Sequence, residues 1–225
     1  MTKARVAVTN EVVLGRVTAE TYDRFARFLR ARGWDSLDSL LNAGLEGENF
    51  LDAGSGPGYI GLEWLKRRGG NARLAGLDIS PEMIALARRN AAECGLEDRT
   101  EYVVGDAMDM PFPDGCFDAV LSNGSIHEWE DPTRGLREIM RVLRPGGRFW
   151  VFDVRRDANP LIKWLIYAII RPKEIRSGFL ASFNASYTLG EMADILDRAG
   201  LHGCGLRREF FGLSIVGSKP GLGSF

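Results

Sequence analysis

Hydrophobic and polar positions along the middle of the chain follow the pattern of a parallel α/β sheet. Short apolar segments predict strands, and amphipathic segments between them predict helices. The predicted strands are residues 49–53, 73–78, 100–104, 117–122 and 147–154, and the predicted helices are 58–68, 81–94 and 132–143. Because strands that alternate with helices form parallel sheets, the pattern predicts a doubly wound α/β fold.

Other patterns flank this core. An amphipathic helix is predicted at 18–32, ending at Gly33, and a second short helix at 36–43. The apolar stripe of the first helix consists of Tyr22, Phe25, Phe28 and Leu29. Beyond residue 154, a capping box at 188–191 begins a helix that runs to 199. Two further strands, near 204–210 and 212–217, resemble an antiparallel pair.

We therefore expect a single domain over residues 1–225. It would consist of an N-terminal helical segment at 1–47, a core at 48–154, an insertion at 155–187, and a last helix with the closing strand pair at 188–219. The insertion is long for a plain connection between a strand and a helix, which favours a role of its own.

The insertion contains the longest apolar run, residues 161–170. This run is about half the length needed to cross a bilayer and includes Lys163, so no stable membrane insertion is expected. It is interpreted as a buried or lid helix, or alternatively as an interfacial or dimer-forming helix. The latter would make the protein a possible homodimer.

Composition narrows the class of protein. The chain is 45% apolar and 26% charged, which is typical of a globular domain. Lys plus Arg number 29 against 30 Asp plus Glu, so no basic excess indicates a nucleic-acid partner. Three separate cysteines and a start without an apolar signal segment favour a reducing, cytoplasmic location. With two histidines and no Cys-x-x-Cys, no metal site is expected.

The most informative segment is residues 50–60, where an apolar strand leads into glycines at every second position. Gly54, Gly56 and Gly58 suit a turn on which a ligand lies directly against the backbone. Asp52 stands two residues before the first of them. Its carboxylate would repel a pyrophosphate but attract an ammonium or a sulfonium. The segment therefore predicts a site for a nucleotide-like ligand with a cationic end.

Two other interpretations of the same loop stay open. Gly56-x-Gly58-x-x-Gly61, with Asp78 about twenty residues further on, also matches the fingerprint of a nicotinamide-dependent reductase. That interpretation leaves Asp52 and the Asp106-Ala107 pair without a role. A non-catalytic module that keeps its cofactor for stability or for protein pairing is the second alternative.

Five motifs in order connect the chain to a known family. They are LDAGSGPG at 51–58, GLDISPEM at 76–83, GDAM at 105–108, FDAVLS at 117–122 and LRPGG at 143–147. With these motifs the chain resembles class I S-adenosylmethionine-dependent methyltransferases, in particular the small-molecule group that includes quinone-biosynthesis methyltransferases. The resemblance covers roughly residues 49–154. It implies a mostly parallel, seven-stranded Rossmann-like sheet with N-terminal helices and a helical lid insertion.

The resemblance also implies a cofactor, S-adenosyl-L-methionine, with S-adenosyl-L-homocysteine as product. Asp52 and the loop residues would hold its methionine portion, and Asp78 would accept from both ribose hydroxyls. Ile79 and Met83 would lie beside the adenine, whose amino group Asp106 would bind and whose ring edge the Ala107 backbone would contact. The implied set is Asp52, Gly54, Ser55, Gly56, Gly58, Asp78, Ile79, Met83, Asp106, Ala107, Ser122 and Asn123. In the structural alternatives, Asp52 is a helix cap, Asp78 a solvated acid and Met83 a core residue.

The acceptor side is less well defined by the sequence. His127 is the candidate general base because imidazole titrates near neutrality, although a loop histidine can simply bind backbone groups. Glu128 is expected to be solvated, and Trp129 either forms a wall of the pocket or anchors the core, with the core favoured. Three aromatic residues of the insertion would either line an acceptor cavity or pack against the sheet: Phe179, Phe183 and Tyr187.

The predicted activity is transfer of a methyl group to a small organic acceptor by in-line displacement. An enzyme that methylates a base nitrogen would be expected to have an acid or Asn followed by two prolines and an aromatic residue after the fourth strand. Residues 122–125 are Ser, Asn, Gly and Ser, so a nucleic-acid acceptor is not expected.

Overall fold

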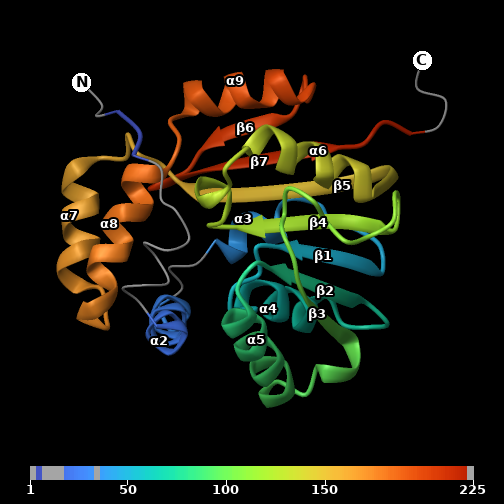
Figure 1. Ribbon diagram of the computed structural model, residues 1–225, viewed down its shortest axis with the longest axis horizontal. Coiled ribbons are helices and arrows are strands. Elements are labelled where there is room, and N and C mark those ends of the chain that lie inside the picture. Colours follow the sequence, from blue (N-terminus) through green and yellow to red (C-terminus); the bar gives the residue numbers. More distant parts are fainter. Residues whose placement is uncertain (1–3, 7–17, 33–35, 222–225) are drawn as a thin grey trace.

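The computed structural model describes residues 4–6, 18–32 and 36–221, and over these the predicted α/β fold is confirmed. Seven strands form one sheet in the order β3-β2-β1-β4-β5-β7-β6 (Figure 1). Their bounds are β1 Asn49–Ala53, β2 Arg73–Asp78, β3 Thr100–Val104, β4 Phe117–Asn123, β5 Leu143–Val154, β6 Gly205–Arg208 and β7 Gly212–Ser218.

The first five strands are parallel and the last two are antiparallel to their neighbours. β1 pairs in parallel with both β2 and β4, so the strand order reverses beside it. In open α/β sheets, ligands bind outside the carboxyl ends of the strands at such a reversal. β7 pairs antiparallel with β5 and with β6, as expected for the closing strand pair. The topology therefore places a site beyond the ends of β1, β2 and β4.

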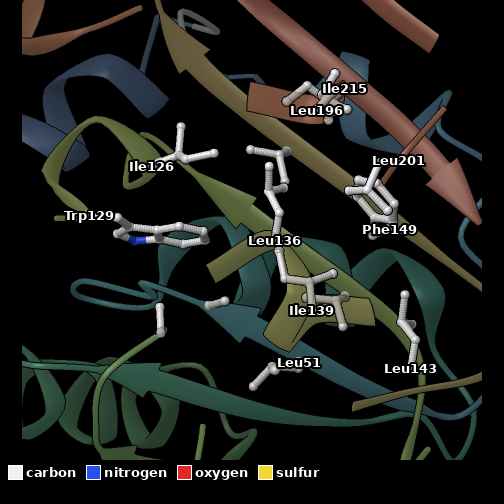
Figure 2. Packing of buried hydrophobic residues seen from close by; sticks show 14 of the residues in the cluster. Leu51, Ile126, Trp129, Leu136, Ile139, Leu143, Phe149, Leu196, Leu201 and Ile215 are labelled. Carbon is white, nitrogen blue, oxygen red and sulfur yellow. The ribbon is translucent and has the colours of Figure 1, made fainter. Parts of the chain in front are cut away.

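Helices cover both faces of the sheet. On one face, α6 Pro132–Val142 and α9 Leu189–Ala199 contribute Leu136, Ile139 and Met192 to a buried apolar cluster with strand residues (Figure 2). On the other face, a second cluster involves α3 Leu37–Leu41, α4 Tyr59–Arg68 and α5 Pro81–Glu93. Because adjacent strand residues point to opposite faces, Phe149 packs in the first cluster and Trp150 in the second.

Three helices begin with capping residues, and the predicted capping box at 188–191 is one of them. The Ser80 hydroxyl accepts from the Met83 N–H at 3.2 Å, and Pro81 occupies the first turn of α5. Asp131 caps α6 in the same way, and Thr188 with Glu191 forms the capping box of α9. These local bonds satisfy backbone donors that would otherwise lack a partner.

Several boundaries differ from the predicted ones. β5 begins at Leu143 and not at the predicted residue 147, because Leu143 pairs with Phe117. A register shift follows this pair, and Gly146 within the irregular part has a φ of +78°. β6 is shorter than the predicted strand near 204–210. The first helix, α2, spans Ala19–Arg30, and the predicted stop at Gly33 lies outside the described residues.

The insertion consists of three short helices. These are α7 Pro160–Ile169, the 3₁₀ turn Lys173–Ile175 and α8 Arg176–Ala185. Together with α2 they lie beyond the carboxyl ends of the strands, away from both sheet faces (Figure 1). A small apolar cluster around Ile170 and Ile175 connects the insertion to Tyr22 and Phe25 of α2.

Candidate active site

Two adjoining cavities lie at the carboxyl ends of the strands. The smaller, of about 130 Å³, lies on the glycine loop and is called the loop cavity here. The larger, of about 580 Å³, lies between the strand ends and α2, α7 and α8 and is called the apolar cavity. The two share the wall residues Tyr22, Ala26, Tyr59, Ile60, Asn123, Gly124 and Glu128. A ligand in one cavity would therefore border a ligand in the other.

The glycine loop is shaped by its contacts with β2 and with the segment after β4. The N–H groups of Gly54 and Ser55 both donate to the Leu77 carbonyl, at 2.8 and 2.9 Å. Gly54 has a φ of +75°, and a Cβ there would lie 2.0 Å from the Ser125 hydroxyl oxygen. At Gly56, whose φ is +51°, a Cβ would meet, among the described residues, only Tyr22, at 3.8 Å. The backbone at Gly56 is thus open to the loop cavity.

Asp52 and Asp78 place two carboxylates beside this loop. Asp52 is 2% exposed, and burial, reinforced by the charge of Asp78, raises its pKa to about 7, against a hydrogen bond from the Gly61 N–H. Asp78 accepts from the N–H groups of Gly56 at 2.7 Å and Ser80 at 2.9 Å. Burial raises the pKa of Asp78 despite these bonds. A cation bound here would favour ionisation of both acids.

Three further predicted residues line the loop cavity. Ile79, at the end of β2, is half exposed, so its apolar surface is available to a flat ring. Met83 also lines the cavity, although its side chain is largely buried. Ser55 borders the cavity too, and its hydroxyl is buried without a hydrogen-bond partner among the described residues.

Three predicted contacts are placed differently by the structure. Ser122 is fully buried and donates to the Ala53 carbonyl at 2.7 Å, so it connects β4 to β1 instead of lining a cavity. Ala107 packs in the core, and the Asp106 carboxylate accepts from the Met108 N–H at 2.8 Å. Neither Asp106 nor Ala107 is among the lining residues of the loop cavity. Asn123, by contrast, lines both cavities and accepts a hydrogen bond from Ser36.

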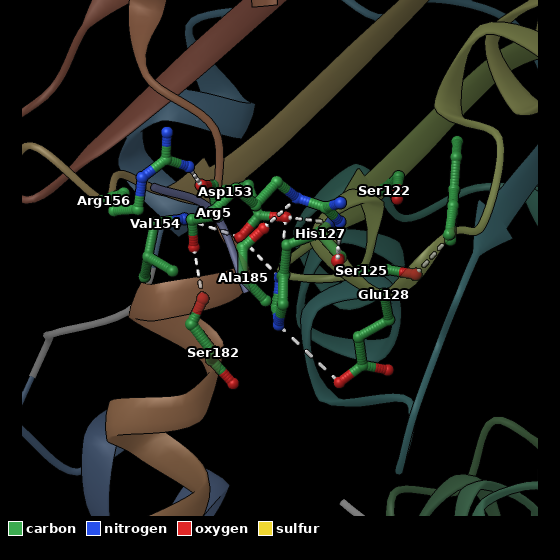
Figure 3. A network of polar contacts seen from close by, with 12 residues as sticks. Arg5, Ser122, Ser125, His127, Glu128, Asp153, Val154, Arg156, Ser182 and Ala185 are labelled. Atoms are coloured by element: carbon green, nitrogen blue, oxygen red, sulfur yellow. Dashed lines mark hydrogen bonds and ion pairs between the residues drawn. The ribbon is translucent and has the colours of Figure 1, made fainter. Parts of the chain in front are cut away.

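His127 forms a buried pair with Asp153, which sequence reasoning missed (Figure 3). The His127 Nδ1 lies 2.9 Å from both carboxylate oxygens of Asp153, and the His127 N–H also donates to Asp153 at 2.9 Å. With the Nδ1 proton held by Asp153, the neutral imidazole has its lone pair on Nε2. That Nε2 is buried and has no hydrogen-bond partner among the described residues. His127 lines the apolar cavity, so this arrangement suits a general base there.

Opposing effects set the pKa of His127. Burial lowers it, but the charge of Asp153, the hydrogen bond with Asp153 and the charge of Glu128 raise it above its ordinary value. Glu128, which was expected to be solvated, keeps 34% of its side chain exposed; it also lines both cavities and has Oε1 3.7 Å from the His127 Nε2. Burial raises the pKa of Glu128. Trp129 is in the core, as predicted.

A buried polar cluster fixes α2 against the glycine loop, and sequence reasoning missed it as well. The Tyr59 hydroxyl donates to Asp23 at 2.6 Å, and the Asn90 amide donates to Asp23 at 3.2 Å and to the Pro57 carbonyl at 2.9 Å. Arg27 donates to Asp23 at 3.0 Å. These bonds hold Tyr22 and Ala26 of α2 over the loop cavity.

Apolar side chains dominate the walls of the larger cavity. α2 contributes Phe25 and Leu29, and the insertion contributes Ile162, Ile166, Phe179 and Phe183. The three aromatic residues of the insertion were predicted either to line an acceptor cavity or to pack against the sheet, and the structure shows both outcomes. Phe179 and Phe183 line the cavity, whereas Tyr187 packs in the core. Such walls suit a hydrocarbon or aromatic molecule better than a sugar or a phosphate.

Comparison with known proteins agrees with the class that this fold and site define. Residues 51–151 match the sequence profile of a methyltransferase domain family. A demethylmenaquinone methyltransferase from Deinococcus radiodurans is 34% identical over 174 residues, which cover 76% of this chain and 71% of that protein. The solved structure of a SAM-dependent methyltransferase from Aquifex aeolicus superposes with a TM-score of 0.63 at 21% identity, covering 82% and 89% of the two chains. This chain belongs to the class I S-adenosylmethionine-dependent methyltransferase family.

Other relatives share only part of their length with this chain. An ajmaline N-methyltransferase from Rauvolfia serpentina is 40% identical over 113 residues, which are 50% of this chain and 38% of that protein. The chain spans less than half the length of several curated relatives that it matches.

Proposed function

We propose that this protein transfers a methyl group from S-adenosyl-L-methionine to a small, largely apolar acceptor. The observation that carries the proposal is the shared wall of the two cavities. An acidic loop cavity adjoins an apolar cavity, and the latter is lined by His127, whose buried Nε2 has no hydrogen-bond partner among the described residues. The similarity to a demethylmenaquinone methyltransferase and to an ajmaline N-methyltransferase supports a small-molecule acceptor.

The residues of the loop cavity fit this cofactor. Asp52 would hold the ammonium of its methionine portion, Asp78 has acceptor capacity for hydroxyl groups, and Ile79 offers an apolar face to a base. On the same loop, the open backbone at Gly56 adds room, and the Ser55 hydroxyl, which has no hydrogen-bond partner within the described residues, adds a polar contact. When bound, the cofactor supplies an activated methyl group on a positively charged sulfur.

The protein's own contribution would be orientation and proton transfer. Tyr22, Asn123 and Glu128 line both cavities and would define the line between donor and acceptor. Holding reactants in such a geometry and excluding water can supply on the order of 7–11 kcal/mol. For an acceptor that carries an O–H or N–H group, the His127 Nε2 would take the proton. Asp153 would hold the ring through Nδ1 and stabilise the resulting imidazolium.

Cofactor affinity should depend on pH through Asp52. Its raised pKa of about 7 means that the acid is largely protonated in the free protein below pH 7. An ammonium binds the ionised form, so affinity for S-adenosyl-L-homocysteine should rise as pH increases from 6 to 8, with proton release on binding. Calorimetry in buffers of different ionisation enthalpy measures both effects. Asp52→Asn should weaken binding roughly 10- to 100-fold and remove this pH dependence; a dependence unchanged in Asp52→Asn would exclude Asp52 as its source.

The proposed function is tested by incubating the protein with methyl-labelled S-adenosyl-L-methionine and a set of apolar phenols, hydroxyquinones and amines. Label transfer to at least one acceptor, with equimolar S-adenosyl-L-homocysteine, is the expected result. Tight cofactor binding without turnover across the set would favour the non-catalytic module. Binding of NADH in place of S-adenosyl-L-homocysteine would favour the reductase.

A further inference from the structure

The outer surface of the insertion carries a group of exposed apolar side chains. On α7, Leu161 and Trp164 are 62% and 61% exposed, and Leu165 and Ile169 are 47% and 44% exposed. Leu180 of α8 is also exposed. Exposed apolar groups of this size on a folded protein mark an interaction surface. We call these five residues the insertion face.

α7 forms a thin wall between this face and the apolar cavity. No residue of α7 is fully buried, and the helix lies at the outer edge of the molecule (Figure 1). Ile162 and Ile166 line the cavity, while Leu161 and Trp164 are exposed and are not among its lining residues. Leu165 and Ile169 line the cavity and are also partly exposed. The cavity and the insertion face therefore meet along one helix.

The segment that carries the insertion face is rich in positive charge. Residues 160–185 contain four cationic side chains, Lys163, Arg171, Lys173 and Arg176, and a single acid, Glu174, in a chain of net charge −1. The Lys163 ammonium donates to the Arg156 carbonyl at 2.8 Å and lies over the ring of the buried Phe183, whereas the other three cations follow α7 in the chain. Two of the cations are fixed at the carboxyl end of α7. Arg171 donates to the Ile170 carbonyl at 3.0 Å, and Arg176 donates to the Ala168 carbonyl at 2.6 Å. Such a site for cations is favoured by the helix dipole.

We infer that the insertion face docks on the surface of an anionic phospholipid bilayer. Apolar side chains with a tryptophan, bordered by Lys and Arg, are the combination that interfacial helices present to anionic lipids. A second copy of the chain fits this surface less well, because a two-fold contact would bring the cationic borders together. None of the described helices has the length and apolar content to span a bilayer, so the contact is peripheral.

Docking would place the edge of the apolar cavity at the lipid surface. Leu165 and Ile169 lie at that edge, so a molecule dissolved in the bilayer could enter between α7 and the rest of the cavity wall without crossing water. This consequence rests on the proposed function, since it makes the acceptor a lipid-soluble compound. The docking itself does not require any methyl transfer.

The test uses the full-length protein and large vesicles of phosphatidylcholine with or without 40% phosphatidylglycerol. Flotation should recover the protein with anionic vesicles and lose it at high salt. Trp164→Glu should lower the partition coefficient at least tenfold. The control is Leu41→Glu, which introduces the same charge at a 41% exposed leucine of α3 and should not change the partition coefficient beyond the effect of one charge. Lys173→Gln should lower it about fivefold. Bound S-adenosyl-L-homocysteine verifies that each variant is folded.

Fluorescence locates the contact. Trp64, Trp129 and Trp150 are buried, and Trp34 lies outside the described residues, so the measurement is made in a Trp34→Phe background. Quenching by brominated lipids should be present in Trp34→Phe and lost when Trp164→Phe is added. Two results would overturn the inference. One is failure to bind either kind of vesicle. The other is a dimer in sedimentation that Trp164→Glu dissociates, which would assign the insertion face to a second copy. Neither depends on methyl transfer, so the proposed function can fail separately.

Discussion

Replacing His127 with alanine should lower kcat for methyl transfer to an O–H or N–H acceptor by about 10²- to 10⁴-fold, the usual contribution of a general base. The reason is that His127 lines the apolar cavity and its Nδ1 is held by Asp153, which leaves Nε2, without a hydrogen-bond partner among the described residues, as the basic atom. Affinity for S-adenosyl-L-homocysteine should change little, because His127 lines the apolar cavity and is not among the lining residues of the loop cavity. Steady-state kinetics and calorimetry measure the two effects.

The pH profile separates a base from a merely structural histidine. Only neutral imidazole accepts a proton, so kcat should rise with pH through a midpoint above the ordinary value for histidine, as its raised pKa requires. In Asp153→Asn, burial still lowers the pKa of His127, but the carboxylate charge that raises this pKa is gone. The midpoint should then move to lower pH and kcat should fall. His202→Ala, at the exposed second histidine, is the control. A wild-type rate that is independent of pH, together with an active His127→Ala, would remove His127 from the mechanism.

The second large effect is expected at Gly54. An alanine there would adopt an unfavourable φ of +75° and place its Cβ 2.0 Å from the Ser125 hydroxyl oxygen. Because the Gly54 N–H also holds the loop against β2, relief of this overlap would distort the loop cavity. Gly54→Ala should therefore weaken S-adenosyl-L-homocysteine binding by about 100-fold or more, since backbone strain and overpacking each cost roughly 1–3 kcal/mol.

Gly69 provides a matched control for this prediction. Its φ is +64°, but a Cβ there would have no neighbour within 4 Å in the part of the chain that the structure describes. Gly69→Ala should thus lower thermal stability through the backbone alone and leave cofactor affinity unchanged. A second substitution, Ser125→Gly, removes the obstructing side chain and should restore part of the binding lost in Gly54→Ala. Equal affinity losses in Gly54→Ala and Gly69→Ala would show that the contact with Ser125 has no role.

The parts of the structure that depend on neighbouring residues were predictable from the sequence. Ser80 and Pro81 begin a helix through bonds within one turn, and the alternating glycines 54, 56 and 58 allow the loop backbone its positive φ values. The site residues at the strand ends could also be predicted, because Asp52 and Asp78 lie in family motifs, and both line the loop cavity.

Contacts between distant residues were not predictable in the same way. Asp153 lies 26 residues from His127, and the available signal was an acid near the end of an otherwise apolar strand. Asp23 meets Tyr59 and Asn90 across 36 and 67 residues, with no local pattern to connect them. Strand parity explains the difference between Ser122 and Asn123. Neighbouring residues point to opposite sides, so the first contacts Ala53 and the second reaches the cavities.

The central claim is that the strand ends bind one adenosyl cofactor with a cationic amino-acid portion. Calorimetric titration with S-adenosyl-L-homocysteine, in parallel with NADH, tests it most directly. We expect saturable binding of one S-adenosyl-L-homocysteine per chain, weakened by Asp52→Asn, and no heat with NADH. Saturable binding of NADH, or an S-adenosyl-L-homocysteine affinity that Asp52→Asn leaves intact, would contradict the account.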